Sequence, residues 1–371
     1  KGILESESKR MSIIKEELLE IKEKYGEERR TEIIEDFTSL SIEDMIAEEE
    51  MVLTITHNGY IKRTSLSTYR SQRRGGRGVQ GASSREEDFV EHLFVANTHS
   101  YILFFTDKGK CYWVKVYDIP EGGRAAKGRA IVNLIGCEPD EKVSAFISVK
   151  EFNEDHYVVM ATEKGMVKKT KLSAYSNPRK KGIYAVEIRD GDKLIEARVS
   201  TGDNDILLGT RNGKSIRFSE EQIRASGRKT MGVKGITLSS EDDRLVGMLL
   251  IKREGTVLVA TEKGFGKRTE ISQYRAQKRG GKGVLTMKTT DKVGKMVTIK
   301  EVVDKDDLMI ITNQGVLIRL PVAQIRSIGR ATQGVKLIKL GEGTLVSSIT
   351  RIMSEEEEDE NNNTESTDPK E

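Results

Sequence analysis

The sequence of 371 residues contains a six-fold internal repeat with a period of about 50 residues. In each repeat a β-rich run ends in the motif Thr-x-x-Gly, and a second glycine follows 19 residues after the first, or 17 in the third repeat. The first glycines are Gly59, Gly109, Gly165, Gly213, Gly264 and Gly315, and the second are Gly78, Gly128, Gly182, Gly232, Gly283 and Gly334. Strand-rich units of this size cannot bury both faces alone and must stack on one another. The repeat therefore predicts an all-β domain over residues 38–353, built as a ring of six four-stranded blades.

The glycines and one apolar position are predicted to be scaffold. Asn-Gly pairs such as Asn58-Gly59 are typical of tight hairpin turns, because glycine tolerates the positive φ that those turns need. A large apolar residue stands nine positions before most second glycines, and we interpret it as a packing anchor. The anchors are Tyr69, Ile119, Ile223, Tyr274 and Ile325, with Tyr175 nearby in the shortened third repeat.

The two ends of the chain differ from the repeats. Residues 1–37 are expected to be a helical segment, because apolar residues recur at intervals of three and four, as in a coiled coil or on an ordinary amphipathic helix. These residues are Met11, Ile14, Leu18, Ile21 and Tyr25, and Gly26 is expected to end the helix. Residues 354–371 contain nine acidic residues, one basic residue and nothing apolar to bury, so they are expected to form a disordered acidic tail.

Charge is divided unevenly along the chain. The net formal charge is −8 over residues 1–50 and −8 over residues 354–371, but +19 over residues 51–353. A body that basic indicates a polyanionic partner, and the alternative is a solvated surface with unequal signs. No apolar run is long enough to span a membrane, and the two cysteines, Cys111 and Cys137, favour a reducing cytoplasm. Because the chain begins at Lys1 without a methionine or signal peptide, we expect it to be a piece of a longer protein.

Cations recur at equivalent places in the repeats, which predicts a charged stripe around the ring. Four residues after the first glycine stand Arg63, Lys169, Arg217, Arg268 and Arg319, with Trp113 in the second repeat. Four residues before the second glycine stand Arg74, Arg124, Arg228, Arg279 and Arg330, with Pro178 in the third repeat. Lys127 and Lys181, each directly before a second glycine, complete the predicted set. A packing role accounts poorly for so many cations, so we interpret them as contacts for a polyanion.

Two repeats carry a longer basic motif with paired glycines. The first repeat has Gln72, Arg73, Arg74, Gly75, Gly76, Arg77 and Gly78, and the fifth has Gln277, Lys278, Arg279, Gly280, Gly281, Lys282 and Gly283. The pair is absent from the aligned positions of the other repeats, so we interpret it as unnecessary for the turn. We expect it to permit close approach, with backbone N–H groups reaching phosphate oxygens. The alternative is a flexible basic loop without a ligand.

The motif over residues 72–78 resembles the signature box of the C-terminal domain found in the A subunit of bacterial DNA gyrase. Residues 25–31 resemble the end of the coiled-coil helix that precedes this domain, and residues 50–60 resemble the beginning of its first blade. The resemblance implies a six-bladed β-pinwheel, a relative of the β-propeller, that wraps double-stranded DNA around its basic edge with little sequence preference. Two alternatives stay open, namely the C-terminal domain of topoisomerase IV, whose box is usually degraded, and a propeller for protein–protein contacts.

The resemblance also implies which activities lie outside this chain. In gyrase the wrap serves ATP-dependent negative supercoiling, while strand cleavage and ATP hydrolysis with Mg²⁺ belong to the rest of the A subunit, which dimerises, and to the B subunit. The sequence itself has no catalytic-triad or zinc-site spacing. We therefore expect no catalytic residue, cofactor or metal in this chain, double-stranded DNA as its direct partner, no membrane association, and a place in the bacterial cytoplasm at the nucleoid.

Overall fold

The computed structural model describes residues 3, 6–27, 42–56, 58–65, 90–123, 126–138, 140–177, 179–252, 255–314, 317–341 and 343–352. The chain divides into two compact units, Lys1–Met45 and Ile46–Glu371. The first unit contains the expected helix, α2 (Glu7–Tyr25), and the 3₁₀ helix η1 (Ile42–Met45). Helix α2 ends before Gly26, where a Cβ atom would lie 2.2 Å from the Lys22 carbonyl oxygen. The predicted boundaries at residues 37 and 354 lie outside the described residues, and none of the described helices is long and apolar enough to cross a membrane.

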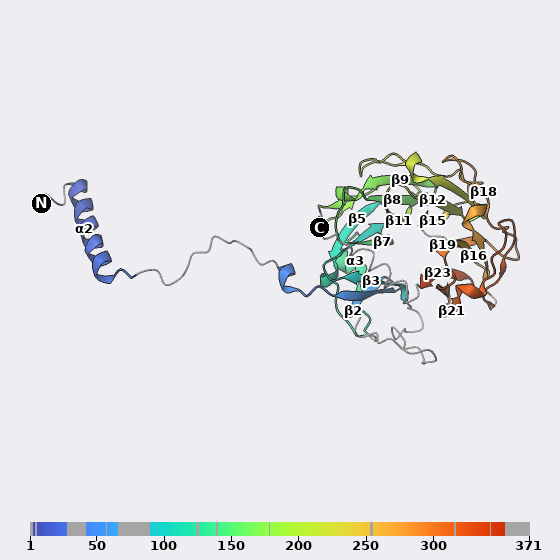
Figure 1. Cartoon of the computed structure of the whole chain (residues 1–371), viewed down its shortest axis with the longest axis horizontal. Helices are drawn as coiled ribbons and strands as arrows, with labels where there is room; N and C mark the ends of the chain where they lie inside the picture. Colours follow the sequence, from blue (N-terminus) through green and yellow to red (C-terminus); the bar gives the residue numbers. More distant parts are fainter. Residues whose placement is uncertain are drawn as a thin grey trace, which may run out of the picture. The chain divides into compact units, whose positions relative to one another are not determined.

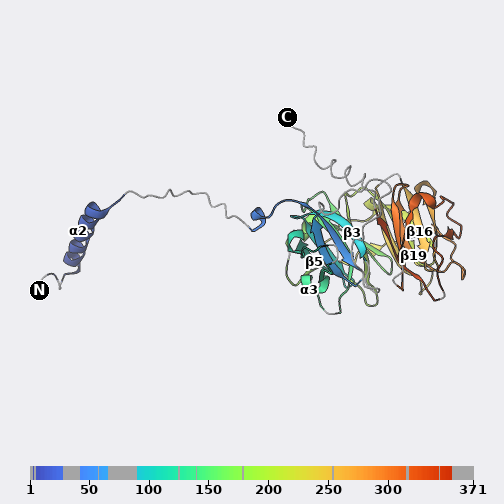
Figure 2. The same cartoon turned by 90° about the horizontal axis from the view of Figure 1, so that it is seen from below.

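The second unit is a ring of six antiparallel sheets around a common axis (Figure 1), and Figure 2 shows the ring from its side. The first sheet contains β1 (Glu50–Thr56), β2 (Tyr60–Ser65), β3 (Val90–Asn97) and β6 (Arg129–Ala130). The second sheet contains β4 (Tyr101–Thr106), β5 (Lys110–Lys115), β7 (Val143–Val149) and β10 (Ile183–Tyr184). The third sheet contains β8 (Tyr157–Thr162), β9 (Met166–Lys171), β11 (Leu194–Ser200) and β14 (Val233–Lys234). The fourth sheet contains β12 (Asp205–Thr210), β13 (Lys214–Ser219), β15 (Leu245–Ile251) and β18 (Val284–Leu285). The fifth sheet contains β16 (Thr256–Thr261), β17 (Phe265–Glu270), β19 (Met296–Val302) and β22 (Val335–Lys336). The sixth sheet contains β20 (Asp307–Thr312), β21 (Leu317–Pro321) and β23 (Val346–Ile352). The predicted all-β ring of six blades is confirmed.

Each complete sheet takes its outermost strand from the following repeat. In the first sheet, for example, β6 belongs to the second repeat and pairs Arg129 with Ile61 of β2. The sixth sheet has three described strands, because the segment after Gly78 that aligns with the other outermost strands lies outside the described residues. On the inner side of the ring, β23 of the last sheet lies beside β3 of the first. Consecutive repeats are therefore joined by shared sheets as well as by packing.

The Thr-x-x-Gly motif forms the hairpin turn between the first two strands of a repeat. The Gly109 N–H donates to the Thr106 carbonyl at 2.9 Å, and the Thr106 hydroxyl accepts the N–H of Lys110 at 3.3 Å. Gly109 has a φ of +78°, a conformation that side chains other than glycine rarely adopt. The threonine and the glycine thus recur because each satisfies a separate requirement of the same turn.

The second glycines and the anchors are scaffold, as predicted. Gly128 has a φ of +82°, and a Cβ atom there would lie 2.4 Å from the Ile61 carbonyl oxygen of the preceding repeat. The described anchors are at most 3% exposed, whereas Tyr69 lies outside the described residues. They lie at or next to the short helices that follow the second strands, which are η3 (Val116–Asp118), η4 (Leu172–Tyr175), η5 (Glu220–Gln222), η6 (Ile271–Gln273) and η7 (Val322–Gln324). One further short helix, α3 (Ile131–Ile135), follows β6.

The apolar core lies between neighbouring sheets rather than at one centre. One cluster joins Leu103 and Phe105 of the second sheet to Val158 and Met160 of the third, and all four residues are at most 1% exposed. From the first sheet to the sixth, consecutive sheets therefore cover the faces that they turn toward each other, and the loops at the outer edge of the ring are left to carry polar and charged residues.

Candidate nucleic-acid interface

In the repeats where the structure describes it, a rim loop runs from the anchor to the second glycine and connects a short helix to an outermost strand. The aligned residues of the first repeat are counted as a rim loop from the sequence. The six rim loops, residues 69–78, 119–128, 175–182, 223–232, 274–283 and 325–334, contain eighteen basic residues and one acidic residue, Glu121. Because the repeats are arranged around an axis, this positive charge recurs at intervals along the outer edge. A polyanion that follows the edge meets one basic loop after another.

The edge that carries the Thr-x-x-Gly turns has a different charge pattern. There cations are paired with carboxylates: Arg211 with Glu262 and Arg244 with Glu163, both at 3.3 Å. Pairing of this kind largely cancels the long-range field of the cations. The rim loops are therefore the part of the ring that we predict to attract a polyanion.

The rim loop of the fifth repeat contains the described copy of the glycine-pair motif. Lys278 and Lys282 are exposed, and neither makes an ion pair within the described part of the chain. Arg279 is half-buried, and its backbone N–H donates to Gln222 Oε1 at 2.8 Å while its side chain donates to the Lys234 carbonyl oxygen at 2.6 Å. This loop presents two free ammonium groups beside an arginine that is held in place by the fourth repeat.

The glycine pair has two different roles in this loop. Gly280 has a φ of +82°, whereas no described residue other than glycine has a positive φ, so Lys229 and Ala331 at the aligned positions do not. The interpretation that the pair is unnecessary for the turn is wrong for Gly280, because this loop has a backbone shape of its own. Gly281 has no positive φ, and a Cβ atom there would make only ordinary contacts, the nearest at 3.4 Å to Ile216 Cδ1. Gly281 is thus the glycine that is compatible with the predicted close approach.

The remaining predicted rim cations lie in equivalent loops. Lys127 and Lys181 are exposed, and Lys127 Nζ lies 4.0 Å from the centre of the Tyr60 ring. Arg228 and Arg330 are half-buried, and Arg330 donates to the Leu285 carbonyl oxygen at 3.0 Å, in the same way as Arg279 binds Lys234. The motif over residues 72–78 and Arg124 lie outside the described residues. Contact of these residues with DNA stays a prediction.

Sequence reasoning missed one recurrent cation. An arginine directly follows the anchor in four repeats, as Arg70, Arg224, Arg275 and Arg326. The last three are exposed and make no ion pair with any residue that the structure describes, whereas Arg70 lies outside the described residues. Aligning the repeats on their anchors, rather than only on their glycines, reveals this position.

The cations four residues after the first glycine join consecutive repeats. Arg63 Nε donates to the Ile119 carbonyl oxygen at 2.7 Å, and Arg217 donates to the Tyr274 carbonyl oxygen at 3.2 Å. Trp113, the exception in sequence, makes the same contact, since its Nε1 donates to the carbonyl oxygen of the anchor Tyr175 at 2.9 Å. These side chains thus donate to the anchor carbonyl oxygen of the next repeat and hold the two repeats together. From the sequence alone, by contrast, such a structural role is a poor explanation for these cations.

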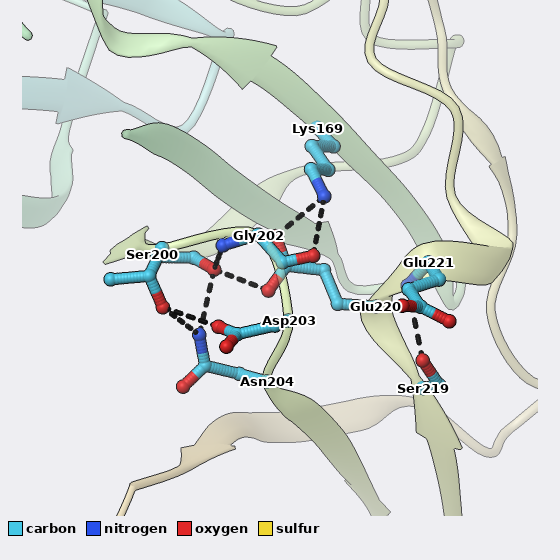
Figure 3. Close-up of polar contacts among 9 residues, drawn as sticks. Lys169, Ser200, Gly202, Asp203, Asn204, Ser219, Glu220 and Glu221 are labelled. Atoms are coloured by element: carbon cyan, nitrogen blue, oxygen red, sulfur yellow. Dashed lines mark hydrogen bonds and ion pairs between the residues drawn. The ribbon is translucent and has the colours of Figure 1, made fainter. Parts of the chain in front are cut away.

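Lys169 departs from that pattern but serves the same purpose. Its Nζ lies 3.0 Å from Glu220 Oε1 and donates to the Gly202 carbonyl oxygen at 3.1 Å, in a network that joins the third repeat to the fourth (Figure 3). Ser200 binds the other Glu220 oxygen and also accepts N–H groups of Gly202 and Asn204. Lys169 is 6% exposed, so its charge is used inside the ring. Arg319, by contrast, has a side chain that is 63% exposed and pairs with Asp307.

No group of three or more His, Cys, Asp or Glu side chains suited to a metal ion occurs among the residues that the structure describes. The described candidate interface is made of cations and backbone on loops. Such an arrangement can neutralise and guide a chain of phosphates.

The chain matches the model of the family described as DNA gyrase C-terminal domain, beta-propeller. The match covers residues 50–97, 100–150, 156–201, 204–252, 255–302 and 306–352, so it finds the same six repeats. The A subunit of DNA gyrase from Staphylococcus epidermidis is 47% identical over 358 residues, which are 95% of this chain and 40% of the relative. The A subunit of DNA gyrase from Staphylococcus aureus strain COL is 45% identical over 370 residues, which are 99% of this chain and 42% of the relative. The chain spans about two fifths of the length of these relatives.

Two solved structures share the fold. A C-terminal domain of DNA topoisomerase IV has a TM-score of 0.73 at 26% identity and covers 87% of this chain and 100% of that structure. A DNA gyrase A C-terminal domain has a TM-score of 0.67 at 24% identity and covers 82% of this chain and 100% of that structure. The structural likeness does not separate gyrase from topoisomerase IV, but the sequence relatives favour gyrase. With the six matched repeats and close relatives over nearly its whole length, the chain belongs to the DNA gyrase C-terminal domain family.

Proposed function

We propose that this domain binds double-stranded DNA and wraps it around the rim loops, as the C-terminal part of the A subunit of DNA gyrase. The observation that carries the proposal is the recurrence of eighteen basic residues against one acidic residue in six equivalent loops. DNA that follows the rim can contact several loops in succession, which a single basic patch does not allow.

A wrap needs many contacts because duplex DNA is stiff. Bending about 40 base pairs through half a turn costs roughly 10 kcal/mol, given a persistence length of about 50 nm. One loop cannot offset that cost. The exposed arginines after the anchors, Arg224, Arg275 and Arg326, add a contact point to each of three successive loops and so help to meet it.

Contacts to phosphates rather than to bases are expected. In its described part the rim consists of loops and two-residue strands, which lack the length to place side chains deep in the major groove. Phosphate contacts carry little sequence information and depend strongly on salt. The proposed binding therefore has weak sequence preference.

In the whole enzyme the wrap presents a DNA segment for strand passage and so supports negative supercoiling driven by ATP. The remainder of the A subunit, which forms the dimer, and the B subunit supply strand cleavage and the site for ATP and Mg²⁺. We also propose that the protein acts in the bacterial cytoplasm, at the nucleoid.

Two measurements test the proposal. Filter binding with random duplex DNA at several salt concentrations should give a slope of log affinity against log salt steeper than about −3, because a shallower slope leaves too few contacts for a wrap. Ligation of nicked circular DNA with the domain bound should shift its linking number, whereas binding without wrapping leaves it unchanged. A propeller for protein contacts predicts neither result.

A matched pair of variants locates the interface. Changing Arg224, Arg275 and Arg326 to Gln should weaken binding and make the salt slope shallower by about 3. Changing Arg211 and Arg244 to Gln on the turn-side edge, where both arginines are paired with carboxylates, should leave the slope unchanged. Equal effects of the two sets would show that DNA does not follow the rim.

A further inference from the structure

Three lysines are buried beneath rim loops, at the position three residues after the first glycine. Lys62, Lys168 and Lys267, in the first, third and fifth repeats, are at most 3% exposed. Burying an ammonium group is costly unless hydrogen bonds compensate for lost water. The aligned residues of the other repeats are Tyr112, Ile216 and Ile318. A buried cation in half of the repeats therefore has a specific task.

Each of these ammonium groups binds main-chain oxygens of the next repeat's rim loop. Lys267 Nζ donates to the carbonyl oxygens of Gly329, at 2.6 Å, and Arg330. Lys168 Nζ donates to the carbonyl oxygen of Arg228. Arg228 and Arg330 are aligned rim arginines, four residues before the second glycine. In both loops the lysine thus holds the backbone of the arginine that the rim presents.

The same two loops are also closed from within. Thr230 and Thr332, two residues before the second glycine, each donate from Oγ1 to a carbonyl oxygen three residues earlier, at 3.0 Å. Lys267 Nζ further donates to Thr332 Oγ1 at 3.2 Å. The lysine ammonium group beneath each loop and the threonine hydroxyl in the loop itself both bind its carbonyl oxygens, and together they fix its shape.

The loop with the glycine pair has neither device. Beneath the fifth rim loop stands Ile216, which is fully buried, and Gly281 replaces the threonine. The first repeat, which carries the other glycine pair in its sequence, follows the sixth around the ring, and the sixth has Ile318 at this position. The second repeat has no glycine pair at the aligned positions, and Lys62 Nζ donates to its Gly123 carbonyl oxygen at 3.0 Å. Among the loops that the structure describes, no glycine pair lies above a buried lysine.

We propose that Lys168 and Lys267 are positioning residues of the DNA-binding rim, which hold the rim loops of the fourth and sixth repeats so that Arg228 and Arg330 meet DNA in preset positions. The inference rests on the proposed function and deepens it. The rim then contains loops preset by a buried ammonium group and loops with paired glycines, whereas the loop of the third repeat, with Tyr112 at the aligned position, has neither feature.

The protonation of these lysines links the loops to pH. Burial lowers the pKa of Lys168 to about 7, Arg228 acts in the same direction, and Glu187 opposes them. Burial lowers the pKa of Lys267 to about 8, and Arg330 acts in the same direction. As pH rises through these values the amines lose their charge, and their hydrogen bonds to the loops become weaker. Bound DNA is a polyanion and favours the charged form, so by linkage DNA affinity should fall over the same pH range.

The first experiment uses the wild-type chain. Lysine ¹³Cε resonances are followed by NMR from about pH 6 to pH 10, a range in which exposed lysines and arginines stay largely charged. The side chains of Lys168 and Lys267 should titrate with midpoints at pH values of about 7 and about 8. Saturating duplex DNA should shift both midpoints to higher pH. Midpoints that do not move on DNA binding would overturn the proposal. This measurement decides the question even where a variant does not fold.

The second experiment compares the double variant Lys168→Met and Lys267→Met with the control Ile216→Met, at the aligned position beneath the fifth loop. The double variant should bind duplex DNA more weakly at neutral pH, have a salt slope shallower by about 2, and lose the pH dependence of wild type. The control should keep the wild-type pH profile. A folded double variant with wild-type affinity and pH profile would contradict the proposal.

A readout without DNA separates this proposal from the proposed function. Amide hydrogen exchange of residues 226–232 and 328–334 should be faster in the double variant and unchanged in the control. If wild type does not bind duplex DNA, the proposed function fails, while the exchange data still report whether the lysines hold the loops.

Discussion

The Nε of Arg268 donates a hydrogen bond to the carbonyl oxygen of Ile325 across 2.6 Å and so joins the fifth repeat to the anchor of the sixth. Arg268 is 8% exposed, and its guanidinium group also pairs with Asp304. Arg63 and Ile119 repeat the contact at the other end of the ring's sequence. A side chain that sequence reasoning assigned to DNA thus serves first to hold neighbouring repeats together.

Arg268→Met should destabilise the domain by about 1–3 kcal/mol, because it leaves the buried Ile325 carbonyl without its charged donor. Arg319→Met is the matched control. Its side chain is 63% exposed and pairs with Asp307, so its loss should cost less than about 1 kcal/mol. Midpoints of urea denaturation measure both, and equal losses would refute the joining role of Arg268.

Gly283→Ala and Gly281→Ala should affect different properties although the two glycines are two residues apart. Gly283 has a φ of +71°, and a Cβ atom there would lie 2.3 Å from the Ser215 carbonyl oxygen, so we expect a loss of about 1–3 kcal/mol in stability. Gly281→Ala should leave the melting temperature nearly unchanged but weaken duplex binding, because a methyl group keeps phosphate away from the backbone. Unaltered binding by Gly281→Ala would remove its role in close approach.

The two glycine-pair motifs should not be equivalent. Arg73, Arg74 and Arg77 changed together to Ala should abolish wrapping and supercoiling in the reconstituted enzyme, since arginine holds phosphate in a more fixed geometry than lysine. Relaxation should survive, because strand cleavage is assigned to the rest of the enzyme. The same change at Lys278, Arg279 and Lys282 should weaken binding but leave measurable supercoiling. Complete loss of supercoiling in the fifth-repeat variant would reverse the ranking.

Deleting residues 355–371 should tighten DNA binding at low salt. The segment after Ser354 brings eight net negative charges close to the basic domain on one chain, so it competes with DNA at a high effective concentration. Salt screens that competition, and the gain should shrink as ionic strength rises. Competition binding at two salt concentrations checks this, and unchanged affinity at low salt would leave the tail only a solubilising role.

The sequence alone determined the repeat architecture, because the requirements it encodes are local. Gly109 is needed for a positive φ in its own hairpin, and the anchor Ile223 recurs because each repeat needs the same buried contact. Requirements of this kind return at fixed intervals and can be counted in a sequence without knowing how the repeats assemble. The excess of basic residues in the rim loops is visible in the same way.

Only the tertiary structure decided what each cation does. The acceptor of Arg268 stands 57 residues later, at Ile325, and the acceptor of Lys168 stands 60 residues later, at Arg228. Such partners meet because each of the first five sheets is completed by a strand from the following repeat, and no local pattern reports which carbonyl oxygen then faces which side chain. Arg224 and Lys168 therefore look alike as cations in the sequence, yet one is exposed on the rim and the other is 1% exposed beneath it, since burial depends on neighbours that only folding brings together.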